Sequence, residues 1–269
     1  MTALVIPSCN IRPHNRVDLL NLLTCLEPDK DKYTKIIVCF DGIEKESEFI
    51  EFFLDKFPFI HPIINELNPS GFSINSNRGL RYCRDELKTG CFLVNQDCIL
   101  PAANHMMQVV GEGLSIPQSI EIPSADSSSL EEKIEYLNLA NTGRTIVRTH
   151  IKDKFAFYCP YFSYELLKEV GLLQEDQKNV YSDDSYVIMT LLNNKFPVEV
   201  VDVKISHRGS HIIPENNWES GSGCYNSIDL SAGLVQHKLK WSIPKDVEHG
   251  EILNYVLKNF VWDDKMRWD

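Results

Sequence analysis

Residues 91–101 read CFLVNQDCILP, and this stretch decides the fold class that we expect. The apolar run from Cys91 to Val94 is typical of a buried strand in a parallel sheet. Three polar residues then end the strand, and the last of them is the carboxylate Asp97. Open α/β sheets bind ligands beyond the carboxyl ends of their strands, so Asp97 is a candidate site residue. An aspartate taken alone would more often be a turn residue or a helix cap.

Strands and helices alternate before this stretch. Short apolar runs predict strands over residues 3–6, 35–40 and 60–67. Apolar positions at helical spacing predict helices over residues 17–26, 49–57 and 74–87. Such alternation builds a parallel sheet with right-handed crossovers. We therefore expect an α/β fold with a mixed, mainly parallel sheet and helices on both faces.

The chain beyond Asp97 predicts a further set of elements. We expect helices over residues 101–110, 163–170 and 185–193, and strands over residues 114–122 and 196–203. The stretch 145–157 alternates as an edge hairpin does. Residues 1–225 are expected to form one domain. Residues 226–269, with helices near 228–241 and 247–260, are expected to form a helical extension packed on it.

Composition narrows the class of protein. The 269 residues are 43% hydrophobic and 24% charged, which is typical of a globular chain. A net charge of −11 argues against a surface that holds nucleic acid or anionic lipid. No apolar run reaches the roughly 20 residues of a membrane span, and we see no signal peptide. The eight cysteines contain no CxxC pair, so we expect reduced core thiols in a cytoplasmic protein.

Polar residues follow several strand ends or open helices. They are residues 7–10, Asp41-Gly42, Asp97 and Asp183-Asp184. Parallel strands bring such residues to one edge of the sheet. Three carboxylate sites at one edge suggest a divalent cation with an anionic ligand, and one carboxylate left for proton transfer.

Short motifs then lie in a definite order along residues 4–241. They are residues 4–10 (LVIPSCN), Asp41-Gly42, residues 76–80 (SNRGL), Asn95-Gln96-Asp97, Asp183-Asp184, His207 and Lys240-Trp241. In this order and spacing they resemble the GT-A glycosyltransferases, especially the inverting family 2. The resemblance implies a GT-A, Rossmann-like fold. It also implies transfer of a sugar from a nucleotide diphosphate sugar, expected to be UDP-linked, to a hydroxyl of a carbohydrate or other acceptor.

The resemblance implies roles on the nucleotide side of the site. The residues that would border the nucleotide are Pro7, Ser8 and Asn10. Asp41 would hold the base, usually uracil, and Arg78 would lie near the diphosphate or the sugar.

The Asn95-Gln96-Asp97 run stands where the family has its DxD motif. The resemblance implies that Asp97 coordinates Mn²⁺ or Mg²⁺ with His207 as the second protein ligand, and that Asn95 and Gln96 lie at the nucleotide. Because Asn95 replaces the first acid, the metal site carries one negative charge fewer. The ion would act as a Lewis acid that neutralises the leaving nucleoside diphosphate.

On the acceptor side, the resemblance implies that Asp184 is the general base, with Asp183 contacting the acceptor or sharing the role. An acceptor hydroxyl is a poor nucleophile, so a carboxylate must take its proton during attack. Attack opposite the leaving group inverts the anomeric carbon. The Gly-, Ser- and Asn-rich stretch 209–223 reads as a loop that closes over the donor, with Trp218 against the sugar.

Each motif also has an ordinary structural reading. Asp41-Gly42 alone would usually be a turn, and Asp183-Asp184 the favourable start of a helix. A stripe of arginines at positions 78, 81 and 84 would usually be a solvated helix face. A lone histidine such as His207 is more often structural than a ligand.

Two other functions stay open at this point. A sugar-phosphate nucleotidyltransferase would share a layered fold, but it would need a glycine-rich phosphate loop where residues 7–10 have no glycine. A non-catalytic nucleotide-sugar-binding module could have kept the fold and lost the chemistry. Asn95 fits such a module, whereas Asp97, Asp184 and His207 argue for an enzyme.

Overall fold

The computed structural model describes residues 1–9, 13–43, 47–66, 70–123, 128–151, 157–175, 182–207, 237–248 and 251–269. The predictions for Asn10, for Trp218 and for the loop 209–223 fall outside these residues, as does the side chain of Asp184.

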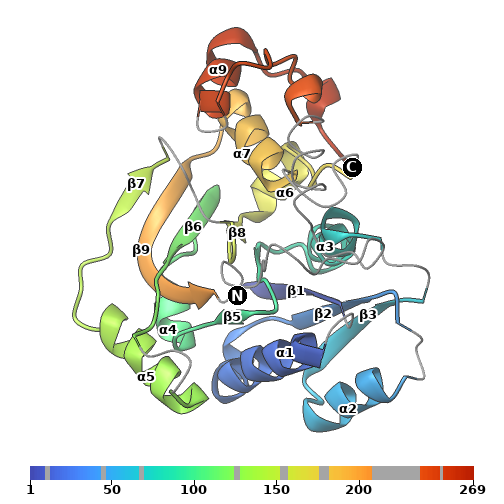
Figure 1. The fold of residues 1–269 in the computed structure, drawn as a ribbon, viewed down its shortest axis with the longest axis vertical. Helices are drawn as coiled ribbons and strands as arrows, with labels where there is room; N and C mark the ends of the chain where they lie inside the picture. Colours follow the sequence, from blue (N-terminus) through green and yellow to red (C-terminus); the bar gives the residue numbers. More distant parts are fainter. Residues whose placement is uncertain are drawn as a thin grey trace.

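Four parallel strands form the first half of the sheet, in the order β3-β2-β1-β4 (Figure 1). Their bounds are β1 (Ala3–Cys9), β2 (Ile36–Asp41), β3 (Ile60–Asn65) and β4 (Cys91–Leu93). These strands were predicted, but β1 runs past Pro7 to Cys9. The register of β1 on β4 covers only Ala3 to Val5, and a proline is tolerated where one side of a strand has no partner.

Within the residues that the structure describes, antiparallel pairs extend this block into a curled mixed sheet of nine strands. The added strands are β5 (Cys98–Ile99), β6 (Leu114–Ser119), β7 (Arg148–His150), β8 (Tyr161–Phe162) and β9 (Val198–His207). The order continues β4-β8-β6-β9-β5, and β7 also pairs with β9. Strand β9 is parallel to β6, and the other new pairs are antiparallel. The sheet is therefore mixed, with a continuous parallel block of β1 to β4 and one further parallel pair, β6 with β9.

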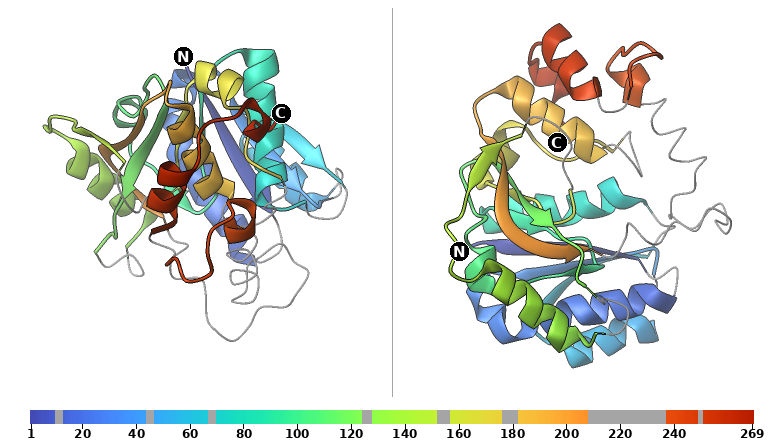
Figure 2. Two further views of the ribbon diagram at one scale, coloured as in Figure 1. Left: turned by 90° about the horizontal axis from the view of Figure 1, so that it is seen from above. Right: turned by 60° about the vertical axis from the view of Figure 1, so that its left-hand side comes forward.

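Helices cover both faces of the parallel block (Figure 1, Figure 2). The helices α1 (Pro13–Leu26) and α2 (Glu48–Lys56) pack on one face, and α3 (Phe72–Arg81), α6 (Tyr164–Glu169) and α7 (Ser182–Asn193) lie on the other. Alternation along β1 explains the two cores. Leu4 and Ile6 join the cluster under α1 and α2, whereas Ala3 and Val5 join the cluster under α3, α6 and α7.

Helix α3 lies unusually close to β1, and a π-helical turn, η2 (Tyr82–Leu87), continues it. A Cβ atom on Gly79 would lie 2.3 Å from Cγ1 of Val5, so only glycine allows this approach. The buried face of the helix is largely polar, with Ser73, Asn75, Ser76 and Asn77. Polar side chains on a closely packed helix bring hydrogen-bonding groups to the sheet.

Two predicted elements differ from the structure between β4 and β8. The helix expected over residues 101–110 is only α4 (Ala103–Met106), because the next residues tighten into turns in which Val109 N donates to Met106 O. Helix α5 (Leu130–Asn141) was missed altogether. Ser129 and Glu132 form a capping box at its start, and the sequence contains that signal.

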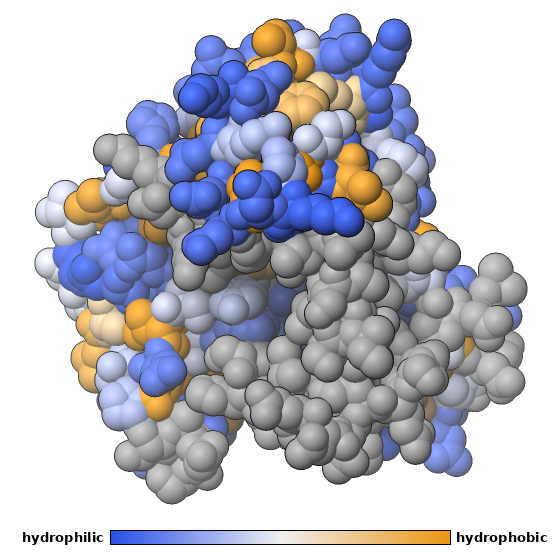
Figure 3. Space-filling model, turned by 45° about the horizontal axis from the view of Figure 1, so that its top comes forward, coloured by the Kyte–Doolittle hydropathy of each residue, from blue (hydrophilic) through white to orange (hydrophobic). Residues whose placement is uncertain are grey.

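The carboxyl-terminal residues pack at the end of the molecule remote from α1 and α2 (Figure 2). A helical turn at 237–240 and helix α9 (Ile252–Asn259) lie there, followed by the short η5 (Asp264–Met266). Trp241 and Val256 share a core cluster with Val187 of α7. Among the residues that carry a hydropathy colour in Figure 3, hydrophilic ones predominate and hydrophobic ones lie in small separate groups. No helix in the described ranges has the length and apolar character to cross a membrane.

Candidate active site

Asp97 and His207 meet at the carboxyl end of β4. The chain turns at residues 95–98, where Cys98 N donates to Asn95 O, and enters β5. Because β5 pairs with the end of β9, Cys98 lies opposite His207, and Nε2 of His207 is 3.0 Å from Oδ1 of Asp97. The Asn95 side-chain nitrogen lies 3.4 Å from the same Nε2. His207 and Asp97 are 8% and 17% exposed, so the pair is accessible yet mostly enclosed.

Tyr158 stacks on the imidazole of His207, with ring centroids 3.6 Å apart and planes 4° apart. Its main chain also holds the turn, because Asn95 N donates to Tyr158 O. Burial raises the pKa of Tyr158, and the charges of Asp97 and Asp183 raise it further. Asp183, in the first turn of α7, therefore contributes to the electrostatic environment of Tyr158, as Asp97 does. Sequence reasoning missed Tyr158, because its position depends on strand pairing around β8.

Asp41 is the centre of a second polar cluster, at the carboxyl end of β2. Its carboxylate is 5% exposed and accepts hydrogen bonds from Nδ2 of Asn65 at 2.7 Å and from N and Oγ of Ser70, both at 2.8 Å. The register places Asp41 beside both Cys9 and Asn65. A buried carboxylate with this many donors is fully solvated by protein and fixed in position.

Arg78 reaches this cluster from α3. Its Nη1 lies 3.0 Å from Oδ1 of Asp41 and 3.3 Å from Oδ1 of Asn75. Asn75 in turn donates to the carbonyl of Cys39 at 2.9 Å, which ties α3 to the end of β2. The Arg78 side chain remains 24% exposed, so part of the guanidinium faces away from Asp41.

The arginine stripe is not a solvated helix face. Arg78 pairs with Asp41, Arg81 with Glu175, and Arg84 with Asp85 and with Asp269 of the chain terminus. The three residues lie one helical turn apart, and each has its own anionic partner. The ordinary reading of this stripe is therefore wrong.

Buried polar atoms without protein partners lie at the ends of the strands. Among the described residues, Ser8 Oγ on β1 and Asn95 Oδ1 after β4 are buried and accept no hydrogen bond. Val94 N donates to Val5 O, so the chain after β4 begins beside the middle of β1, three residues before Ser8. A buried polar atom left unpaired is costly, and such atoms in native proteins usually have a partner. Hydroxyl groups of a ligand would supply one.

The predicted site residues thus fall into two clusters at one edge of the parallel block. Asp41 and Arg78 form one, and Asn95, Asp97 and His207 form the other, with Ser8 on the strand between. Pro7 and Gln96 are buried beside them. The backbone of Asp184 lies in α7. The supporting roles of Asn65, Ser70 and Asn75 were not predicted, because Asn65 reaches Asp41 through the pairing of β3 with β2, Ser70 through the chain before α3, and Asn75 acts through Arg78.

The metal-ligand atoms that the second cluster offers suit a hard or borderline cation. One carboxylate oxygen and one imidazole nitrogen converge, and Mn²⁺ accepts both ligand types. Within the described ranges no group of three or more His, Cys, Asp or Glu side chains suited to a metal ion occurs. A cation held here would need oxygen ligands from elsewhere, such as a diphosphate. Asp97 and His207 therefore fit a metal ion that a bound ligand would also coordinate.

No protein family and no curated protein matches this sequence. Solved structures do match its fold. The S. aureus protein TarS, residues 1-349 in complex with UDP, has a TM-score of 0.53 at 14% identity and covers 96% of this chain and 70% of its own. The mannosyltransferase PcManGT from Pyrobaculum calidifontis, with GDP-Man and Mn²⁺, has a TM-score of 0.57 at 15% identity and covers 95% and 69%.

A third match is GalNAc-T7 with UDP, GalNAc and Mn²⁺, with a TM-score of 0.54 at 12% identity, covering 82% of this chain and 47% of the other. The chain spans 42% of the length of a longer TarS structure. At these sequence identities the matches are evidence for the fold alone. The strand order, the helices on both faces and these matches agree, and the chain has the GT-A-like fold of the glycosyltransferases.

Proposed function

We propose that this protein is an inverting glycosyltransferase of the family 2 type, moving a sugar from a nucleotide diphosphate sugar to an acceptor hydroxyl. The observation that carries the proposal is the His207–Asp97 contact of 3.0 Å at the carboxyl end of β4, in a fold of the GT-A type. Open α/β sheets bind ligands at this edge. The matched structures contain UDP, UDP-GlcNAc or GDP-Man, which favours a nucleotide sugar as the donor class.

The donor would lie across both clusters. The fixed carboxylate of Asp41 faces the nucleobase, expected to be uracil, and the part of Arg78 not used by Asp41 faces the base or the diphosphate. Ser8 and Asn95 supply buried oxygens that can accept hydrogen bonds from ribose or sugar hydroxyls. Each of these groups lies at the end of a strand or on α3, which the sheet holds rigid.

Asp97 and His207 would hold Mn²⁺ or Mg²⁺ together with the donor diphosphate. Bound there, the ion supplies Lewis-acid neutralisation of the leaving group. Asn95 is neutral where a second carboxylate would add charge, so affinity for the ion depends strongly on the diphosphate oxygens. Tyr158 keeps the imidazole plane fixed for this contact.

The acceptor would be activated from α7. Asp184 takes the proton of the attacking hydroxyl at one carboxylate oxygen, and Asp183 lies beside it with its charge near Tyr158. The positive end of the α7 dipole favours the ionised form of both carboxylates. Attack opposite the leaving nucleotide breaks the anomeric bond as the new one forms, and the configuration is inverted.

Calorimetry with UDP, with and without Mn²⁺, tests the donor site. The wild-type protein should bind UDP more tightly with Mn²⁺, and Asp97→Ala should lose that difference. Asp202→Ala is a matched control, because Asp202 is a carboxylate of β9 that pairs with Arg144 and Lys204 away from this site. Equal Mn²⁺ dependence in Asp97→Ala and the wild type would remove the metal assignment. A screen of nucleotide sugars for donor hydrolysis then identifies the sugar.

One observation favours a binding-only role as the second candidate. In the described residues the metal cluster has two ligands, and Asn95 stands where a third could be. Such a module would bind UDP and Mn²⁺ but neither hydrolyse nor transfer any donor. Asn95→Asp restores the family pattern. If the wild-type protein is inactive and Asn95→Asp gains turnover, the wild-type protein is a binding module.

A further inference from the structure

Ser185 directly follows the Asp183-Asp184 pair in the first turn of α7, and it is fully buried. Its hydroxyl oxygen accepts a hydrogen bond from Nε1 of Trp241 at 3.2 Å. The same hydroxyl lies 3.2 Å from Nδ1 of His237, which is also fully buried. Two side chains from the carboxyl-terminal residues thus converge on one hydroxyl, one residue beyond the candidate base.

The next residue of α7 has a second connection to the same part of the chain. Tyr186 is fully buried, and its hydroxyl donates to the carbonyl of Gly171 at 3.1 Å. Gly171 pairs as an isolated bridge with Trp268, and Leu172 N donates to Trp268 O at 2.7 Å. Gly171 has φ +91°, and a Cβ there would lie 2.3 Å from Trp268 O. Only glycine permits this close contact.

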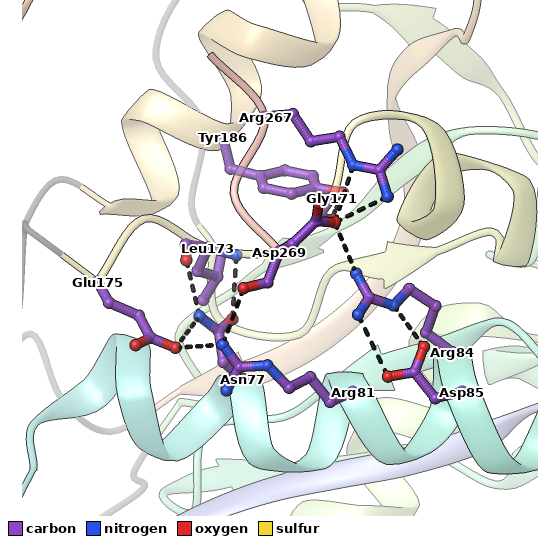
Figure 4. A network of polar contacts seen from close by, with 10 residues as sticks. All are labelled: Asn77, Arg81, Arg84, Asp85, Gly171, Leu173, Glu175, Tyr186, Arg267 and Asp269. Atoms are coloured by element: carbon purple, nitrogen blue, oxygen red, sulfur yellow. Dashed lines mark hydrogen bonds and ion pairs between the residues drawn. The ribbon is translucent and has the colours of Figure 1, made fainter. Parts of the chain in front are cut away.

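The segment after Gly171 is held from below by α3, as Figure 4 shows. Asn77 bonds the main chain of Leu173 in both directions, at 2.7 and 3.0 Å. Glu175 accepts from Asn77 and from Arg81, both at 2.9 Å, and Arg81 also donates to the main-chain oxygen of Asp269 at 3.2 Å. The carboxyl terminus, the segment 171–175 and α3 therefore form one connected polar network.

From these contacts we infer that Trp241 and His237 are positioning residues, which hold the first turn of α7 and so place the Asp183-Asp184 carboxylates against the donor site. The inference rests on the proposed function for its catalytic meaning. The hydrogen bond from Trp241 to Ser185 is buried and directional, so it fixes the rotation of α7 about its axis and its position along that axis. Aromatic bulk alone would fill the same space without fixing either.

Misplacing a catalytic group by about 1 Å can cost roughly 10²-fold in rate, even when the change lies away from the chemistry. Trp241→Phe keeps the aromatic ring and removes the N–H donor. We expect it to lower kcat about 10- to 100-fold, with KM for the donor and the UDP affinity unchanged. A loss confined to kcat would indicate that α7 is misplaced, because a damaged donor site would also change the KM for the donor and the UDP affinity.

Trp262→Phe is the matched control. Trp262 lies in the same carboxyl-terminal part, and its Nε1 donates at 3.0 Å to Asp264, two residues on. The substitution therefore removes an indole hydrogen bond that does not reach α7, and kcat should stay at the wild-type value. Ser185→Ala removes both this bond and the contact with His237, so it should lower kcat at least as much as Trp241→Phe does, and the double variant should be no slower than Ser185→Ala alone.

Hydrogen exchange on the full chain provides a readout apart from activity. Amides of residues 182–186 should exchange faster in Trp241→Phe than in Trp262→Phe, while those of β1 and β2 stay as in the wild type. Equal kcat and equal exchange in the two tryptophan variants would overturn the inference and leave the proposed function standing. A wild-type protein that transfers no sugar refutes the proposed function instead, and the exchange result then decides the positioning role alone.

Discussion

The imidazole of His207 lies parallel to the phenol ring of Tyr158, with 3.6 Å between centroids and 4° between planes. This stack orients the histidine so that Nε2 points to Asp97. Because the ring is stacked on one face, it can rotate little about its Cβ–Cγ bond. Its Nε2 atom therefore stays in a position to contact a ligand. Tyr158 thereby acts on the site through another residue.

Tyr158→Leu should weaken Mn²⁺ binding in the presence of UDP by roughly 2- to 10-fold, because an aromatic stack is worth about 0.5–1.5 kcal/mol beyond the area it buries. Tyr158→Phe keeps the stack and should match the wild type. Titration of Mn²⁺ followed by electron paramagnetic resonance measures both. Equal weakening in the two variants would show that the hydroxyl, and not the ring, matters.

The pKa of Tyr158 should lie above its ordinary value of 10, because burial and the charges of Asp97 and Asp183 disfavour the phenolate. Absorbance at 295 nm, as a difference between wild type and Tyr158→Phe, measures it. The contribution to stability is present below about pH 10 and is lost as pH rises toward the folded pKa, since the unfolded chain loses its proton first. Wild-type stability should therefore fall more steeply above about pH 10 than that of Tyr158→Phe.

Asp41→Asn should destabilise the fold by about 2 kcal/mol, less than the roughly 3–5 kcal/mol of a fully buried pair because Arg78 is partly exposed. The asparagine also places an NH₂ group among the donors of Asn65 and Ser70. Urea unfolding measures the change. Asp85→Asn is the control, since that carboxylate is 52% exposed and its pair should contribute under about 1 kcal/mol. UDP affinity should fall in Asp41→Asn alone.

Gly79→Ala should destabilise the protein by about 1–3 kcal/mol, although alanine favours helices, because its Cβ would overlap the Val5 side chain. Moving α3 away from β1 also shifts Arg78, so UDP affinity should weaken in parallel. Leu139→Ala, on an exposed position of α5, should stay within about 0.5 kcal/mol of the wild type. Thermal unfolding of the three proteins gives the comparison, and a neutral Gly79→Ala would contradict the close approach.

Asp184→Asn should lower kcat by roughly 10²–10⁴-fold while UDP affinity is retained, the usual effect of removing a positioned general base. Single-turnover transfer and calorimetry with UDP measure the two quantities. Transfer at the wild-type rate would return the base role to Asp183. Loss of UDP binding would instead place Asp184 on the donor side.

Local sequence signals were sufficient for the amino-terminal half of the fold. Continuous apolar runs marked β1, β2, β3 and β4, because strands buried on both faces need no polar positions. The signal for α5 was present in Ser129 and Glu132 and was overlooked. Strands β5 and β8 have two residues each, so no period can show in them, and only their partners make them strands.

The candidate site was predictable where its residues follow strand ends, as Asp41 and Asp97 do. The contact of Asp97 with His207 was expected only from the family resemblance, and its geometry comes from pairing between β5 and β9. Tyr158 could not be predicted, because nothing near it in sequence specifies a stack with a residue of β9. Glu175, the partner of Arg81, and Asp269, the distant partner of Arg84, lie 94 and 185 residues away, so a helix-face pattern cannot reveal them.

The pairing of β5 with β9 also decides when, during translation, the contact between Asp97 and His207 can form. Asn95 and His207 are 112 residues apart in the chain. The parallel strands β1 to β4 all lie between Ala3 and Leu93, so they can pair before β9 is made. A nascent chain that ends before β9 carries Asp97 but no imidazole to complete the pair. The contact between Asp97 and His207 therefore forms only after β9 has been made, later than the pairing of the parallel strands.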